Sequence, residues 1–233
     1  MPDILVIDDD EDFVRMVGPL LESRGYAVRI ARTGAKGMAM CQESAPHGVL
    51  LDGLLPDTNG ITWLEKFRTM QPDTPVWLVS AFRFAQEAKA HARLTKELGA
   101  KVLSKPIDVS VLMSQITAAI ISVEDLPELD DAQLLSDLEA EFTAELPGKL
   151  AHLQQAVREF AAQPTPQSYS AALMQAHKLH GSAGMYGLNE LGERAGLLEK
   201  MLREAEPGSA NGGMHQLDAR TQAMQLVSRL SEP

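Results

Sequence analysis

The sequence has little cysteine, few aromatic residues and no long apolar run. Cys41 is the single cysteine among 233 residues, so an intramolecular disulfide is excluded, and a lone thiol fits a reducing compartment. No apolar segment approaches the ~20 residues needed to cross a bilayer. The amino terminus lacks the basic region and apolar stretch of a secretory signal. These absences predict a soluble, cytoplasmic protein that does not associate with membranes.

Positive charge is also scarce, and its shortage is uneven along the chain. Residues 1–123 carry 13 Lys and Arg against 15 Asp and Glu, whereas residues 124–233 carry 8 against 17. The net charge of the whole chain is −11. Without a basic stripe to neutralise phosphates, we expect no direct binding to nucleic acid.

The first half of the chain alternates between short apolar runs and helix-length amphipathic segments. The runs predict strands over residues 4–7, 27–30, 49–51, 76–79 and 101–103, and the segments predict helices over 12–24, 33–43, 60–70, 84–98 and 109–122. Such alternation is typical of a doubly wound parallel sheet in an α/β domain. We therefore predict a five-stranded α/β domain over residues 1–122.

The second half shows no strand pattern and predicts an all-α domain. Residues 123–131 are acidic and contain Pro127, so we interpret them as a linker between residues 1–122 and a second domain of residues 132–233. Apolar residues then recur at spacings of three and four. Pro147 predicts a new helix start or a kink, since a proline inside a helix loses a hydrogen bond. Amphipathic helices with short connections indicate an antiparallel four-helix bundle.

Carboxylates follow two of the predicted strands at the point where each strand ends. Asp8 and Asp9 follow the first strand, and Asp52 ends the third. Functional groups of open parallel sheets gather beyond the carboxyl ends of the strands. The three carboxylates would form an oxygen-rich pocket suited to Mg²⁺, while Asp10 or Glu11 would cap the following helix.

Residues 1–122 resemble a response-regulator receiver domain of two-component signalling, which has a flavodoxin-like fold. The resemblance rests on four clusters in the family's order: Asp8-Asp9, Asp52 with Pro56 and Gly60, Ser80-Ala81, and Lys105-Pro106. It implies that Asp52 accepts a phosphoryl group as an acyl phosphate. It further implies that Mg²⁺ is held directly by Asp9, Asp52 and the backbone carbonyl of Leu54, with Asp8 acting through water. Ser80, Lys105 and Pro106 would stabilise the phosphoryl group and take part in the switch.

Residues 134–230 resemble a histidine phosphotransfer (HPt) domain. The motif is Ala176-His177-Lys178-Leu179-His180-Gly181-Ser182-Ala183, followed by Gly184 and Leu188. The resemblance implies that His177 is the phosphoacceptor. On a helical wheel His177 falls away from the apolar face, so we expect it to be exposed, with Gly181 giving a partner room to approach. His180 stands where the family usually has a lysine, so the supporting charge would depend on pH.

The favoured interpretation is a two-component phosphorelay protein that accepts a phosphoryl group on Asp52 and exchanges one through His177. The alternative is a phosphorylation-regulated interaction or dimerisation module whose bundle is not phosphorylated. The expected partners are histidine kinases, other receiver and HPt domains, or a second copy of this chain. No constellation for an external substrate shows, so we do not expect an enzyme beyond Mg²⁺-dependent self-phosphorylation and dephosphorylation.

Overall fold

The computed structural model describes residues 1–80, 93–105, 107–120, 132–207 and 213–230. Its first unit contains a parallel sheet of five strands in the order β2-β1-β3-β4-β5. The strands are β1 (Asp3–Ile7), β2 (Ala27–Ala31), β3 (Gly48–Asp52), β4 (Val76–Ser80) and β5 (Ala100–Ser104). The doubly wound sheet predicted from the sequence is thereby confirmed. Because β1 and β3 are neighbours, the acids that end them lie at one edge of the sheet.

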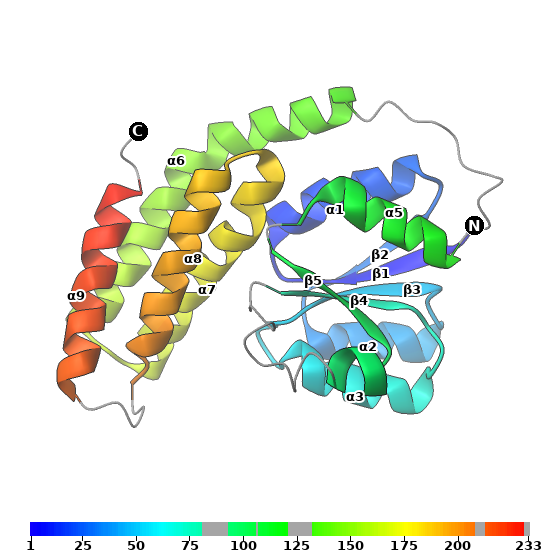
Figure 1. Cartoon of the computed structure of the whole chain (residues 1–233), viewed down its shortest axis with the longest axis horizontal. Helices are drawn as coiled ribbons and strands as arrows, with labels where there is room; N and C mark the ends of the chain where they lie inside the picture. Colours follow the sequence, from blue (N-terminus) through cyan, green and yellow to red (C-terminus); the bar gives the residue numbers. More distant parts are fainter. Residues whose placement is uncertain (81–92, 106, 121–131, 208–212, 231–233) are drawn as a thin grey trace. The chain divides into compact units, whose positions relative to one another are not determined.

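Helices cover both faces of this sheet. Figure 1 shows α1 (Glu11–Ser23) and α5 (Val109–Ile120) on one face, and α2 (Gly34–Glu43) and α3 (Gly60–Met70) on the other. Three of them begin at capping side chains that accept hydrogen bonds from the first turn: Asp10 for α1, Thr33 for α2 and Asn59 for α3. Such caps satisfy backbone N–H groups that have no partner within the helix. Each cap thus fixes where a helix leaves the loop at the carboxyl edge.

The core of the first unit lies between the sheet and these helices. Every residue of β3 and β4 is buried, as expected for central strands covered on both faces. On the α2 and α3 side, Trp63 and Phe67 stack with their ring centroids 4.9 Å apart and pack against Leu51 and Leu78. β3 is therefore buried along its whole length up to Asp52, which ends it, and β4 is buried up to Ser80.

The second unit is helical. Its described elements are α6 (Ala132–Ala162), α7 (Pro166–Ala183), the short η4 (Gly184–Tyr186), α8 (Asn189–Glu204) and α9 (Gly213–Arg229), and the four long helices run side by side (Figure 1). A capping box of Thr165 and Ser168, with Pro166 in the first turn, starts α7. The chain divides into compact units of residues 1–136 and 137–233.

Of the two outcomes predicted at Pro147, the new helix start was wrong, because α6 runs unbroken from Ala132 to Ala162; the kink stays a prediction. Proline frees the carbonyl four residues earlier, here that of Thr143. Both residues are exposed, so water can donate to that carbonyl. Of the helix predicted over residues 84–98, the described part holds only the short η2 (Arg93–Glu97), and the predicted linker lies outside the described residues. Among the described helices, none combines the length and apolar character that a membrane span requires.

Candidate functional site

Three carboxylates meet at the carboxyl edge of the sheet, as the sequence predicts. Asp8, Asp9 and Asp52 each offer an oxygen atom within 4.8 Å of the others. Asp8 and Asp52 are almost fully buried. Burial raises the pKa of Asp8 above its ordinary value, neighbouring carboxylates raise it further, and Lys105 opposes the shift. This small set of oxygen donors fits a hard divalent cation such as Mg²⁺.

Lys105 supplies a buried positive charge beside these acids. Its Nζ lies 3.2 Å from Oδ1 of Asp52 and 3.5 Å from Oδ2 of Asp8. Burial favours the neutral amine, but the charges of Asp52 and Asp8 outweigh it and raise the pKa of Lys105. The backbone N–H of Lys105 donates to the carbonyl of Ser80, which ties β5 to β4 at this edge. Lys105 is therefore fully charged at neutral pH and held against the proposed phosphoacceptor.

Ser80 lies at the end of β4, next to the residue that follows Asp52. A Cβ atom placed on Gly53 would lie only 2.7 Å from Oγ of Ser80 and 2.9 Å from its Cβ. The N–H of Gly53 also donates to the carbonyl of Val79 at 2.7 Å. A side chain at position 53 would thus displace Ser80. Sequence reasoning did not single out Gly53, because the contact comes from the pairing of β3 with β4.

The turn after Asp52 is closed by a second glycine. A Cβ on Gly60 would lie 2.5 Å from the backbone oxygen of Asp52, so only glycine fits there without a shift. Leu54 lies in this turn and forms an antiparallel bridge with Asn59. Pro106 lies outside the described residues.

In the second unit His177 faces a carboxylate. Its Nδ1 lies 3.1 Å from Oε1 of Glu199, which is on α8. His177 is 2% exposed, so the expectation of an exposed histidine was wrong. The wheel assumed one apolar face, whereas α7 also buries residues outside it, including Leu173, His177 and Gly181.

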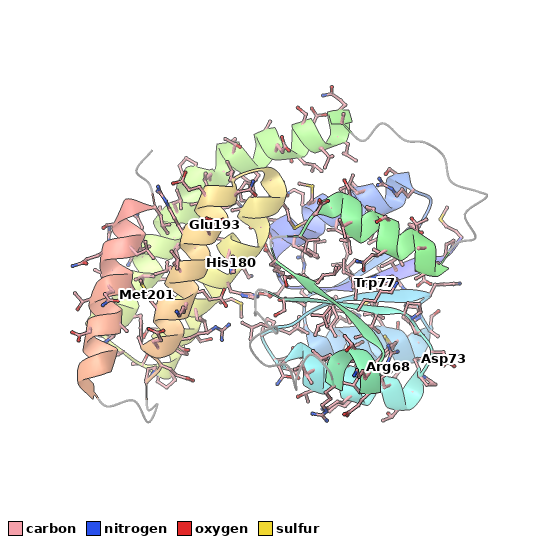
Figure 2. The ribbon with its side chains drawn as sticks, viewed as in Figure 1. Arg68, Asp73, Trp77, His180, Glu193 and Met201 are labelled. Carbon is pink, nitrogen blue, oxygen red and sulfur yellow. The ribbon has the colours of Figure 1, made fainter. Side chains whose placement is uncertain are left out.

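His180 contacts the same carboxylate from one turn further along α7. Its Nδ1 lies 3.0 Å from Oε2 of Glu199. The opposite edge of its ring lies against α8, where a Cβ added to Gly196 would be 2.8 Å from Nε2. Figure 2 shows His180 beside α8. Gly196 thus provides the space in which the His180 ring sits.

Glu199 connects these histidines to a fixed charge. Arg203, one turn along α8, donates to Oε1 of Glu199 at 2.6 Å. Burial favours the protonated acid, but hydrogen bonds from His177 and His180, with Arg203 adding to them, hold the pKa of Glu199 well below its usual range. Glu199 is therefore a buried anion with three partners.

Sequence reasoning missed Glu199, although a signal was present. Ala195, Leu198, Glu199 and Leu202 have the spacing of one helix face, and the other three members are buried apolar residues. A charged residue within an apolar stripe is unusual unless it is paired. Such a residue indicates a partner on a neighbouring helix.

Two family models match the chain. The model of the response regulator receiver domain matches residues 4–117, and the model of the Hpt domain matches residues 137–227. These matches bear out both resemblances drawn from the sequence.

Several known proteins are similar to part of the chain. The photosynthetic apparatus regulatory protein RegA of Rhodovulum sulfidophilum is 32% identical over 122 residues, covering 52% of this chain and 62% of RegA. The DNA-binding dual master transcriptional regulator RpaA of Synechocystis sp. is 31% identical over 131 residues, covering 55% of this chain and 53% of RpaA. The chain thus spans between half and two thirds of the length of these relatives. The solved non-phosphorylated HemR receiver domain of Leptospira biflexa is 28% identical with a TM-score of 0.47, covering 54% of this chain and 98% of that one.

Proposed function

Since the chain joins a response regulator receiver domain to an Hpt domain and so belongs to two-component phosphorelay signalling, we propose that Asp52 and His177 are its two phosphoryl-accepting residues. The observation that carries this proposal is the contact of the buried Lys105 ammonium with both Asp52 and Asp8. It sets a permanent positive charge beside the carboxylate that would accept the phosphoryl group and beside its neighbour Asp8.

In the first step a carboxylate oxygen of Asp52 attacks the phosphorus of a donor. The new P–O bond forms as the bond between phosphorus and the donor's leaving group breaks. Phosphoryl transfer needs in-line positioning and charge neutralisation more than covalent help. Lys105 faces the phosphoryl oxygens with its ammonium group, and the hydroxyl of Ser80 donates to one of them. Asp52 is held in place by the turn that Gly53 and Gly60 close.

Asp8, Asp9 and Asp52 would hold Mg²⁺, together with the backbone carbonyl of Leu54. The fit rests on the three clustered carboxylates, which are the hard oxygen ligands this ion prefers. When bound, the ion supplies positive charge that stabilises the developing charge on the phosphoryl oxygens.

In the second step the nucleophile is a ring nitrogen of His177. A carboxylate can only accept a hydrogen bond, so the proton of neutral His177 is assigned to Nδ1, which faces Glu199. The lone pair is then on Nε2. This nitrogen attacks the phosphorus of an acyl phosphate, and the P–O bond to the aspartate breaks as the P–N bond forms. Glu199 is a positioning residue that fixes the tautomer and the ring.

Both ring nitrogens of His180 face groups of α8. Its Nδ1 is turned to Glu199, and its Nε2 lies beside Gly196. We therefore assign His180 the role of supporting Glu199 and the charge near His177, with Gly181 lying beside them on α7.

The proposed chemistry predicts which proteins can exchange phosphoryl groups with this chain. Histidine kinases and HPt domains can donate to Asp52, and other receiver domains can exchange with His177. A homodimer would bring both sites together in trans. The protein is proposed to act as a phosphoacceptor in the cytoplasm, without direct contact with nucleic acid and without an external substrate.

The lability of the phosphoryl groups tests the two assignments. The full chain is treated with phosphoramidate in the presence of Mg²⁺, since small phosphodonors can phosphorylate both sites, and the base-labile acyl phosphate is measured separately from the acid-labile phosphohistidine. We expect Asp52→Asn to lose the base-labile label, as should Lys105→Ala or removal of Mg²⁺ by a chelator. His177→Gln should lose the acid-labile label.

His180→Gln is the matched control for the histidine assignment and should retain acid-labile label. Base-labile label at the wild-type level in Asp52→Asn would contradict the assignment of Asp52. If no variant carries acid-labile label, the result would favour the alternative function, an interaction or dimerisation module whose bundle is not phosphorylated.

A further inference from the structure

Lys105 has a third neighbour besides Asp8 and Asp52. Its Nζ lies over the ring of Phe13, 5.1 Å from the ring centroid. The side chain of Lys105 is fully buried, and Phe13 is 1% exposed. A cation within about 6 Å of an aromatic centroid is attracted by the negative face of the ring, most strongly where water is excluded. The ammonium group therefore lies between two carboxylates and one aromatic face.

Hydrogen bonds within the acidic segment of residues 8–12 position Phe13 beside Lys105. The N–H of Asp10 donates to Oδ1 of Asp8 at 2.8 Å, and the N–H of Asp12 donates to Oδ1 of Asp10 at 3.0 Å. These bonds fix the start of α1, on which Phe13 lies, relative to Asp8. The position of the ring and that of the carboxylate are thus set by one short, constrained segment.

We propose that Phe13 is a positioning residue for phosphorylation, holding the Lys105 ammonium toward Asp52 with its aromatic face. The proposal rests on the proposed phosphorylation of Asp52. The ring attracts the cation without offering it a strong hydrogen-bond acceptor, so the N–H groups of Lys105 stay directed at the carboxylates and the incoming phosphoryl oxygens. The ring also occupies space that water would otherwise fill beside the ammonium.

A role in packing alone makes a different prediction. Phe13 is one of several buried apolar residues on α1, among them Val14, Val17 and Leu21. If it only fills the core, the charge distribution of its ring is irrelevant. Fluorinated phenylalanines separate the two roles, because they change ring size little but weaken the negative face with each added fluorine.

The experiment introduces phenylalanine with one, two or three ring fluorines at position 13 of the full chain. Acetyl phosphate is the donor with Mg²⁺ present, and the initial rate of base-labile phosphorylation is measured. In this reaction the carboxylate of Asp52 forms the new P–O bond and acetate leaves. We expect the rate to fall stepwise with fluorine number, and Phe13→Leu to lower it by roughly tenfold.

Phe67 provides the matched control. It is equally buried in the same domain, and its cationic neighbour is Arg68, at 5.9 Å, rather than the lysine beside Asp52. The same fluorinated series at position 67 should leave the phosphorylation rate unchanged. An equal fall in both series would reduce Phe13 to a packing residue, as would a flat series at position 13.

A second measurement does not depend on phosphorylation. In the unphosphorylated chain, the ring of Phe13 should shift the NMR signals of the Lys105 side chain upfield, and Phe13→Leu should abolish that shift. An absent ring-current shift in the wild type would overturn the contact. If the wild type shows the shift but Asp52 takes no label, the proposed function fails while the contact of Phe13 with Lys105 stands.

Discussion

Oε1 of Glu199 lies 3.1 Å from Nδ1 of His177, although the two residues are 22 positions apart and come from different helices. The same oxygen accepts a hydrogen bond from Arg203. A buried carboxylate with a fixed cation beside it orients the imidazole while part of its charge is already balanced. The bundle thus gives His177 one orientation and one tautomer, which an isolated helix could not do.

The first prediction concerns the charge of Glu199. Glu199→Gln can still accept from Nδ1 but loses the charge that fixes the tautomer, so we expect phosphorylation of His177 to fall by roughly tenfold. The rate of acid-labile labelling by phosphoramidate measures this, in an Asp52→Asn background that removes the other route. Glu193→Gln is the control, because Glu193 is exposed on the same helix (Figure 2). Equal rates in both variants would remove Glu199 from the mechanism.

The second prediction concerns stability against pH. The folded-state pKa of Glu199 lies below the ordinary value of 4.5, since hydrogen bonds from His177 and His180 outweigh burial. A group with a depressed folded pKa adds stability above its unfolded pKa, and this stability is lost progressively as the pH falls from that value through the folded pKa. Wild type should therefore be more stable than Glu199→Gln at neutral pH, and the difference should shrink progressively as the pH falls below about 4.5. Urea unfolding at several pH values measures this, and a constant difference would refute it.

The third prediction concerns the approach of Gly53 to Ser80. Gly53→Ala would put a methyl group 2.7 Å from Oγ of Ser80 and 2.9 Å from its Cβ, so Ser80 must move. We expect a loss of stability of about 1–3 kcal/mol and a slower phosphorylation of Asp52. Gly18→Ala is the control, because a Cβ on Gly18 of α1 meets nothing within 4 Å. That change should stabilise the protein by about 0.5–1 kcal/mol. Thermal unfolding and the labelling rate distinguish the two variants.

The sheet and its acidic edge could be predicted from the sequence because their signals are local. Each strand is a short apolar run, and parallel strands bring the residues that follow them to one edge, so Asp8 and Asp52 had to be close. The contact of Gly53 could not be predicted in the same way, because it depends on which strand lies beside β3. For Glu199 the apolar stripe of α8 indicates a buried partner, but the identity of that partner depends on the rotation of α8 against α7, which no local pattern encodes.

The burial of His177 shows a further limit of pattern reasoning. A helical wheel finds the most apolar face of a helix, and small or polar residues can be buried outside that face. On α7 the buried residues include Gly181 and Ser182. A polar residue can be buried at low cost when a partner forms a hydrogen bond with it, as Glu199 does with His177.

The fourth prediction concerns the charge of His180. Lysine carries a permanent positive charge near neutral pH, and such a charge beside His177 would stabilise the phosphoryl oxygens in the transition state. We therefore expect His180→Lys to speed acid-labile labelling of His177 relative to the neutral His180→Gln. Rates of labelling by phosphoramidate provide the measurement, and equal rates in the two variants would exclude the charge at position 180 from the reaction.

The last prediction uses the fit between Gly196 and the His180 ring. A Cβ on Gly196 would lie 2.8 Å from Nε2 of His180, 2.9 Å from Cε1 and 3.1 Å from Cδ2, so the whole ring edge must move. Alanine is also the better helix former, by about 0.5–1 kcal/mol. We expect the crowding of the His180 ring to outweigh the gain in helix propensity. Gly196→Ala should therefore lower the stability of the protein by about 1 kcal/mol and weaken the contact of His180 with Glu199.

The sign of this effect should reverse once the ring is removed. In a His180→Ala background nothing opposes the new methyl group, so Gly196→Ala should become stabilising by about 0.5–1 kcal/mol. Gly148→Ala on α6 is the reference for the propensity gain, because a Cβ there meets nothing within 4 Å. Urea unfolding of the four chains of this double-mutant cycle measures the coupling. If Gly196→Ala has the same effect with and without the His180 ring, the glycine does not hold that ring in place.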